Sequence, residues 1–216
     1  MTTYFKATRP DGTDFRTGTI DYAAALVSGE VIRHPAKRVK DDSATYLSIS
    51  VEPADCTGFS WPCRLFRVEP VGRAYRASVS NSKRAVSALR VVEELPAHMT
   101  LGPNGEQVAA FIERCKSLTD SQAKKLAAAG GAAWDAAWDA ARDAAWDAAR
   151  DAAWDAARVA AGYAARGAAW GAAWDAAWDA AGGAASAILV RDLITPEQYA
   201  LLVKPFVDAD LGEWVA

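Results

Sequence analysis

Residues 128–183 read AAGG AAWD AAWD AARD AAWD AARD AAWD AARV AAGY AARG AAWG AAWD AAWD AAGG, fourteen tandem units that each begin with two alanines. The third position is Trp in seven units, and the fourth position is Asp in eight. Because alanine has the highest helix propensity of all residues, half of every unit favours a helix. The sequence therefore predicts a helix over 132–181, which would be about 75 Å long if it were straight.

The irregular units of the repeat suggest how such a helix would present its side chains. A period of four rotates by about 40° per unit on a helix of 3.6 residues per turn, so a uniform repeat would spiral around the surface. The expected Asp is replaced at 159, 163, 167 and 171, where it would otherwise enter the arc of Trp residues. These substitutions favour one continuous amphipathic helix, although a hairpin near Gly162 remains an alternative. The predicted stripe consists of Trp134, Trp138, Val159, Tyr163, Trp170, Trp174 and Trp178.

The predicted helix needs a partner for this stripe. A head of about 100 residues has a radius of gyration of only about 13 Å, which is too small to cover a helix of that length. We therefore predict a homo-oligomer, with the repeat helices paired antiparallel in the manner of a coiled coil. The alternative is intramolecular, with the helices that flank the repeat folding back along the stripe.

The remaining sequence predicts an α+β chain, with a small mixed or antiparallel β head followed by an all-α region. Residues 1–96 contain short alternating runs separated by turns such as Arg9–Gly12, which are typical of strands. Residues 97–131 predict two short helices, and 184–216 predict a helical end that follows the repeat at 132–183. Capping boxes mark helix starts at Thr119 and Thr195. The pair Gly130–Gly131 predicts a break before the repeat.

A basic sector with aromatic residues is the candidate ligand-binding site of the head. Such mixtures bind phosphates or stack on bases, although alternating strands also place charges on a solvated face. An enzyme acting on a phosphate-bearing substrate would have to gather His34 or Cys63 with these arginines, and a nucleic-acid binder would use the same surface. The loop around Trp61 has a simpler interpretation as a plug that covers the core. The candidate residues are Trp61, Arg64, Arg67, Arg73 and Arg76.

Charge and cysteine content narrow the function classes. The net charge is −3, divided between a head at 1–95 with a net charge of +3 and a final segment at 132–216 with a net charge of −7. The three cysteines have no metal-ligand or redox spacing, so we expect no metal, cofactor or disulfide framework. No catalytic constellation is evident. The N-terminus lacks the apolar segment of a signal peptide, and the repeat is interrupted by charges, so we expect a soluble, cytoplasmic protein without membrane contact.

Several motifs resemble an uncharacterised domain family of actinobacteria and their phages. They are Arg-Pro-Asp-Gly at 9–12, Thr-Gly-Thr-Ile-Asp-Tyr at 17–22 and Cys-Thr-Gly-Phe-Ser-Trp-Pro-Cys-Arg-Leu-Phe at 56–66. Proteins of that family often carry Ala/Trp/Asp/Arg-rich repeats followed by a segment like Arg-Asp-Leu-Ile at 191–194. The resemblance implies a phage or mobile-element origin and brings no established activity. We therefore predict a non-enzymatic accessory protein that self-associates and binds a host protein or a nucleotide-type ligand.

Overall fold

The computed structural model describes residues 3–40, 42–56, 60–77, 82–133, 136–151, 159, 161–165 and 175–215. The chain forms two compact units, Met1–Thr100 and Leu101–Ala216. The first contains the sheet, and the described residues of the second form helices and turns, which confirms the mixed α and β class. The division falls four residues beyond position 96, where the sequence placed the end of the head.

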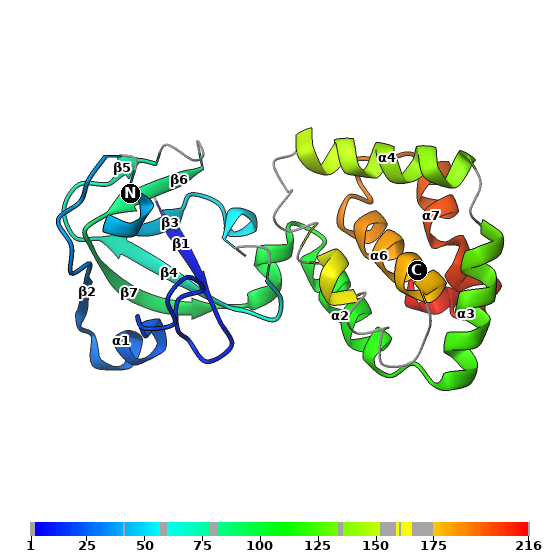
Figure 1. Cartoon of the computed structure of the whole chain (residues 1–216), viewed down its shortest axis with the longest axis horizontal. Coiled ribbons are helices and arrows are strands. Elements are labelled where there is room, and N and C mark those ends of the chain that lie inside the picture. The colour runs from blue at the N-terminus through cyan, green and yellow to red at the C-terminus, as the bar shows by residue number, and fades with distance from the viewer. Residues whose placement is uncertain are drawn as a thin grey trace. The chain divides into compact units, whose positions relative to one another are not determined.

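The first unit, or head, is built on one antiparallel sheet (Figure 1). Its strands run in the spatial order β2-β7-β4-β1-β3-β6-β5, so β1 at the N-terminus lies in the middle. The strands are β1 Tyr4–Thr8, β2 Val31–Arg33, β3 Leu47–Ser50, β4 Arg64–Pro70, β5 Tyr75–Arg76, β6 Lys83–Val86 and β7 Ala88–Leu95. The helical turns are α1 Tyr22–Ser28, η1 Ser43–Thr45, η2 Pro53–Asp55 and η3 Ala97–Leu101.

Side-chain alternation gives the head a core on each face of the sheet. Phe66 and Val68 of β4 belong to the larger cluster, which also contains Tyr22 of α1. Leu65, the neighbour of Phe66, points to the other face and packs with Cys56 and Cys63. This is the period of two that a strand requires when both of its faces are covered.

The turn before α1 depends on a glycine at position 12. Gly12 has φ 90°, and a Cβ atom placed there would lie 2.5 Å from the Cβ of Ala23. Gly72 has a similar φ of 98°, but a Cβ atom there would meet nothing within 4 Å. The two glycines therefore share the backbone conformation and differ in the space around them.

We expect Gly12→Ala to lower the free energy of unfolding by about 3 kcal/mol, since left-handed strain and an overpacked contact add together. Gly72→Ala adds strain alone and should cost about 1 kcal/mol. Urea denaturation of the two variants checks this difference. Equal losses of unfolding free energy would contradict the prediction, because they would show that α1 can shift away from a Cβ atom at position 12 at no cost.

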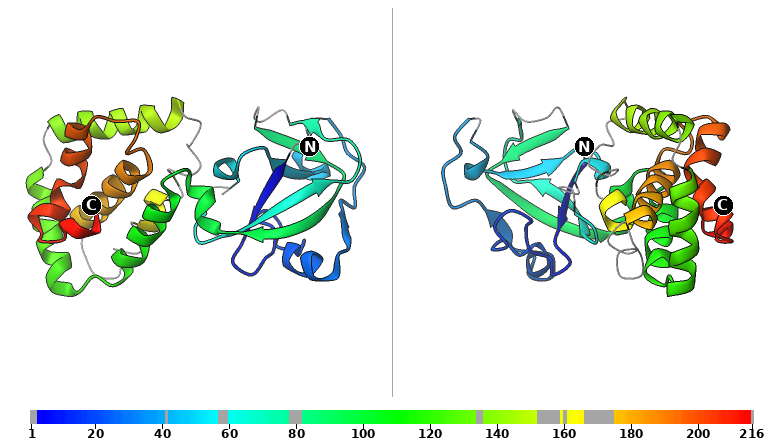
Figure 2. Two further views of the ribbon diagram at one scale, coloured as in Figure 1. Left: turned by 180° about the vertical axis from the view of Figure 1, so that it is seen from behind. Right: turned by 45° about the vertical axis from the view of Figure 1, so that its right-hand side comes forward.

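The second unit, or helical unit, surrounds one central helix. Helix α6 packs against α2, α3, α4 and α7 (Figures 1 and 2). The elements are α2 Gly105–Lys116, α3 Asp120–Ala133, α4 Ala136–Asp151, α6 Asp175–Leu189, α7 Pro196–Asp208 and the short turn η4 Gly212–Trp214. Residues 161–165 are also helical. Alanine and glycine on most sides of α6 allow its neighbours to approach closely, as a helix that is apolar all round requires.

The prediction of one continuous helix over the repeat was wrong. The ring of Trp138 in α4 lies against Gly183 in α6, where an added Cβ atom would be 3.0 Å from the ring carbon Cζ2. On a straight helix these two residues would be roughly 65–70 Å apart. The repeat therefore folds back on itself between these two residues, as the hairpin alternative required, although Gly162 itself lies within the helical residues 161–165.

The buried residue of the repeat is its second alanine, and tryptophan is buried only in places. From position 141 onward, every second alanine with a described side chain is at most 2% exposed: Ala141, Ala145, Ala149, Ala161, Ala165, Ala177 and Ala181. A drift of about 40° per unit accumulates to only about 80–120° over three or four units, which an apolar stripe tolerates. Short helices thus keep one alanine face in contact, whereas fourteen units in one helix would lose it.

The two glycine pairs lie inside helices rather than at breaks. Gly130–Gly131 belongs to α3, and Gly182–Gly183 belongs to α6. The predicted break at Gly130–Gly131 was therefore wrong. At Gly183 the physical reason is visible, because the missing side chain gives the Trp138 ring room against the α6 backbone. Tertiary packing offsets the low helix propensity of glycine at this point.

Candidate functional site

A groove in the helical unit brings three parts of the repeat together. It has a volume of about 180 Å³ and an open mouth. Helix α4 contributes residues spaced by four, and α6 contributes residues spaced by three and four, which is the spacing of one helix face. The lining residues are Trp138, Arg142, Trp146, Val159, Gly162, Tyr163, Asp179, Gly182, Gly183 and Ser186.

Aromatic side chains give the groove a buried floor and an exposed rim. Trp138 is 3% exposed, whereas Trp146 is 50% exposed and Tyr163 is 62% exposed. Trp146 lies two turns beyond Trp138 on α4, where the drift of the repeat has turned it towards solvent. Large aromatic residues left half in water are typical of binding surfaces.

The groove also carries charges of both signs. The Arg142 guanidinium lies 5.4 Å from the centre of the Trp138 ring and forms an ion pair with Asp139 at 3.1 Å. Asp179 enters from α6. The Ser186 hydroxyl donates a hydrogen bond to the Gly182 carbonyl at 2.9 Å, so this part of the wall is held in place. The surface therefore combines apolar rings with one cation and one carboxylate.

The predicted stripe is only partly reproduced by this groove. Trp138, Val159 and Tyr163 do meet there, although they lie on separate helical segments. Trp178 is half-buried on α6. The other predicted interface residues, Trp134, Trp170 and Trp174, lie outside the described residues. Arg142 and Asp179 were missed as groove residues, because their convergence depends on how the helices fold back.

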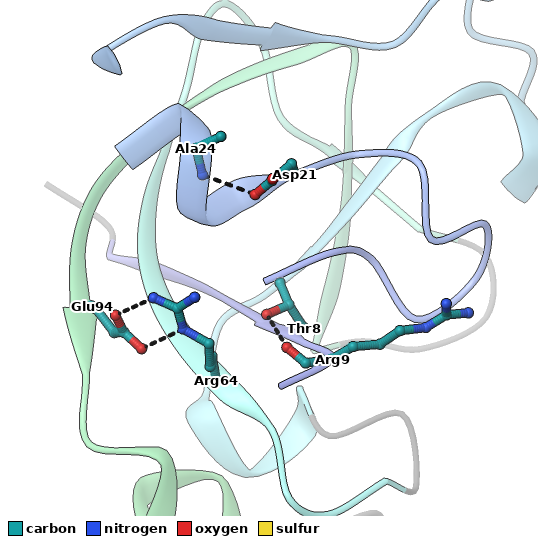
Figure 3. A network of polar contacts seen from close by, with 6 residues as sticks. All are labelled: Thr8, Arg9, Asp21, Ala24, Arg64 and Glu94. Carbon is teal, nitrogen blue, oxygen red and sulfur yellow. Dashed lines mark hydrogen bonds and ion pairs between the residues drawn. The ribbon is translucent and has the colours of Figure 1, made fainter. Parts of the chain in front are cut away.

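The predicted arginine cluster of the head is not gathered into one site. Arg64 shares a face of β4 with Phe66, whereas Arg67 shares the opposite face with Leu65. Each guanidinium is paired with a carboxylate of β7: Arg64 with Glu94 at 2.7 Å (Figure 3), and Arg67 with Glu93 at 2.6 Å. The hydrogen bonds from Arg64 lower the pKa of Glu94. These arginines are therefore neutralised across the sheet.

Arg73 and Arg76 belong to a different part of the head. Strand β5, which contains Arg76, lies at the sheet edge and is separated from β4 by β1, β3 and β6. Arg73 lies 5.2 Å from the centre of the Tyr75 ring, and Arg38 lies 3.9 Å from it. Tyr75 thus interacts with two guanidinium groups, away from Arg64 and Arg67.

The residues required by the enzyme alternative also lie apart. Trp61 packs against the core cluster that contains Cys56, Cys63 and Leu65. Cys63 contacts the Thr100 hydroxyl at 3.5 Å, and burial raises the pKa of its thiol. His34 is in a loop after β2, where its Nδ1 accepts a hydrogen bond from the Ala36 amide at 3.1 Å. Cys63 is buried, His34 is half-buried in its loop, and Arg64 and Arg67 lie on opposite faces of the sheet, so these groups are not gathered as the enzyme alternative requires.

Lys6 has a lowered pKa, and no sequence pattern had singled it out as a candidate site residue. Its ammonium donates to the Ser48 carbonyl at 3.2 Å and lies 5.4 Å from the centre of the Tyr22 ring. Burial, followed by the nearby charge of Lys83, lowers the pKa of Lys6 to about 8. Such a pKa is common at functional sites, but a structural lysine in a sheet core produces it as well.

The described residues contain neither a cluster of metal-ligating side chains nor a membrane-spanning helix. Among them, no group of three or more His, Cys, Asp and Glu side chains is arranged to hold a metal ion. Within the same residues, every helix is too short or too polar to cross a membrane. Comparison with protein-family models, with curated proteins and with solved structures found no match.

Proposed function

We propose that this protein is a non-enzymatic binding protein that self-associates through the groove of its helical unit. The observation that carries the proposal is the exposure of Trp146 and Tyr163 beside the buried ring of Trp138. Burying two such aromatic side chains removes a large apolar area from water, and tryptophan and tyrosine contribute strongly to binding energy at interfaces.

A second copy of the chain is the occupant that the groove chemistry favours. A two-fold interface must be complementary to itself, because the same patch meets itself across the axis. The groove contains both Arg142 and Asp179, so it carries charges of both signs, and Arg142 also pairs with Asp139 of its own helix. A patch of one sign would repel itself in the same arrangement.

The biological context that we propose comes from the sequence resemblance to a domain family of actinobacteria and their phages. In this context the chain is a phage or mobile-element accessory protein. In that proposal the helical unit joins copies, and the head presents a surface to a host protein or a nucleotide-type ligand. Arg73, Arg76 and Tyr75 are exposed and belong to such a surface. The enzyme alternative receives less support, since Arg64 and Arg67 point to opposite faces of the sheet.

We expect the wild-type protein to be a dimer or higher oligomer at tens of micromolar, as measured by light scattering after size-exclusion chromatography. The double variant Trp146→Ala, Tyr163→Ala should be a monomer at the same concentration. Both side chains project into solvent within one chain, so far-UV circular dichroism should show that the variant keeps its helices.

The matched control for this experiment is Leu193→Ala. Leu193 is 46% exposed in the same unit but lies outside the groove lining. This variant should associate like the wild type. A wild-type monomer at tens of micromolar would contradict the proposal, and so would an oligomer that the double variant leaves intact.

A further inference from the structure

A second pocket of the helical unit gathers positive charge. It has a volume of about 140 Å³ and is formed by α2, the end of α6, the start of α7 and the C-terminal turn η4. Its lining combines two arginines, two amides and two aromatic rings with a small apolar wall. The residues are Asn104, Gln107, Ala110, Arg114, Ile188, Arg191, Tyr199, Trp214 and Val215.

Both guanidinium groups of this pocket are held by neutral partners. Arg114 donates to the backbone carbonyl of Glu213 at 3.0 Å. Arg191 lies 5.0 Å from the centre of the Tyr199 ring, and the Tyr199 hydroxyl is itself fixed by a hydrogen bond to the Val215 carbonyl. These contacts position the two cations without cancelling their charge. In the head, by contrast, Arg64 and Arg67 are paired with glutamates.

The two arginines of this pocket belong to a helical unit that is acidic as a whole. Residues 101–216 carry 10 Lys and Arg against 16 Asp and Glu, a net charge of −6. Asp192 follows Arg191 in the sequence, and its Oδ2 accepts a hydrogen bond from the Asn104 side chain at 3.1 Å. Among the described residues, ion pairs within 4 Å include neither Arg114 nor Arg191.

We infer that this pocket binds a small organic oxyanion, a carboxylate or phosphate monoester attached to a planar ring. Guanidinium groups recognise such oxyanions through short, charge-assisted hydrogen bonds. The amides of Asn104 and Gln107 provide further donors at the same opening, and the rings of Tyr199 and Trp214 offer apolar surface to the planar part. The volume suits a single ring with its anionic group rather than a polymer.

Isothermal titration calorimetry of the full chain against four probes tests this assignment. Benzoate and phenyl phosphate represent the two oxyanions, and benzamide and phenol are their neutral counterparts. At least one anion should bind, its neutral counterpart should bind at least 10-fold more weakly, and the affinity should fall as salt is raised. The stronger anion then identifies carboxylate or phosphate as the preferred group.

Variants Arg114→Gln and Arg191→Gln should each weaken the bound anion by at least 10-fold. The matched control is Arg150→Gln, which removes an exposed arginine of α4 that pairs with Asp147 in the same unit. It should leave the affinity unchanged, as should Trp146→Ala in the groove. Loss of self-association in the latter variant would not disturb anion binding, so the two proposals fail separately.

Three outcomes would overturn the inference. They are no binding of either anion at millimolar concentration, equal binding of an anion and its neutral counterpart, and an affinity that both pocket variants leave intact. The comparison of anion with neutral probe uses the wild-type protein alone, so it decides the question even if a variant fails to fold.

Discussion

Trp138→Ala should lower the free energy of unfolding of the helical unit by about 3–5 kcal/mol, the loss expected when a large buried aromatic side chain is removed. Trp138 is 3% exposed, and its ring fills the space above Gly183. Alanine at 138 would leave a cavity between α4 and α6, which the rigid backbone at Gly183 cannot fill. Urea denaturation followed by circular dichroism at 222 nm measures the loss.

The repeat supplies its own control for this prediction. Trp146 occupies the same position of its unit as Trp138, two units along the same helix, but it is 50% exposed. Trp146→Ala should therefore change the free energy of unfolding by less than about 1 kcal/mol when monomers are compared at low concentration. Equal losses from the two variants would contradict the burial of Trp138 against α6, since only Trp138 is enclosed there.

Asp14→Ala should lower the free energy of unfolding of the head by about 3 kcal/mol, because it leaves several backbone amides without an acceptor. Asp14 is 5% exposed, and its carboxylate organises the loop before α1. It accepts hydrogen bonds from the Arg16 amide at 3.1 Å, the Thr17 amide and hydroxyl at 2.7 Å, the Thr19 amide at 3.1 Å and the Ile20 amide at 3.0 Å.

The same contacts make the contribution of Asp14 depend on pH. Burial by itself would raise the pKa of this carboxyl group, but the hydrogen bonds from Thr17, Ile20 and Thr19 outweigh it and lower the pKa from 3.8 to about 2. A folded-state pKa below the unfolded value stabilises the fold above about pH 4, and this contribution disappears as the pH falls towards 2. The difference between wild type and Asp14→Asn should therefore shrink over that range.

Asp11→Ala is the control in the same loop. Its carboxylate is exposed and accepts hydrogen bonds from the amide and hydroxyl of Thr13. We expect a small change in the midpoint of urea denaturation. A loss as large as that of Asp14→Ala would mean that the whole turn, rather than the buried carboxylate, stabilises this part of the head.

Local sequence signals predicted several elements correctly. The capping box at Thr195 and Gln198 is formed, and α7 begins at Pro196 as predicted. Thr119 and Gln122 exchange the equivalent hydrogen bonds at the start of α3. The alternating runs of the head form strands, including 47–50 and 88–95. These signals succeed because each depends on contacts between residues close in sequence.

Local sequence signals did not predict which residues come together in the candidate sites. Trp138, Val159 and Tyr163 were placed on one side of one helix, and they meet instead across separate segments of a folded-back repeat. Helical periodicity identifies which side chains share a face of a helix. It does not distinguish a face that packs against another copy of the chain from one that packs against another segment of the same chain. The pocket of Arg114 and Arg191 was not predicted, because its two arginines are 77 positions apart in the sequence.

The sequence by itself determined the helical nature of the repeat, the strands of the head and the helix starts, since alanine propensity, alternation and capping act over a few residues. Only the tertiary structure decided that the repeat folds back around α6 and that, among the described side chains from position 141 onward, its second alanine rather than its tryptophan is buried throughout. The physical reason is packing. Alanine and glycine let helices approach closely, and a drifting four-residue period stays in contact with a neighbour only over a few turns.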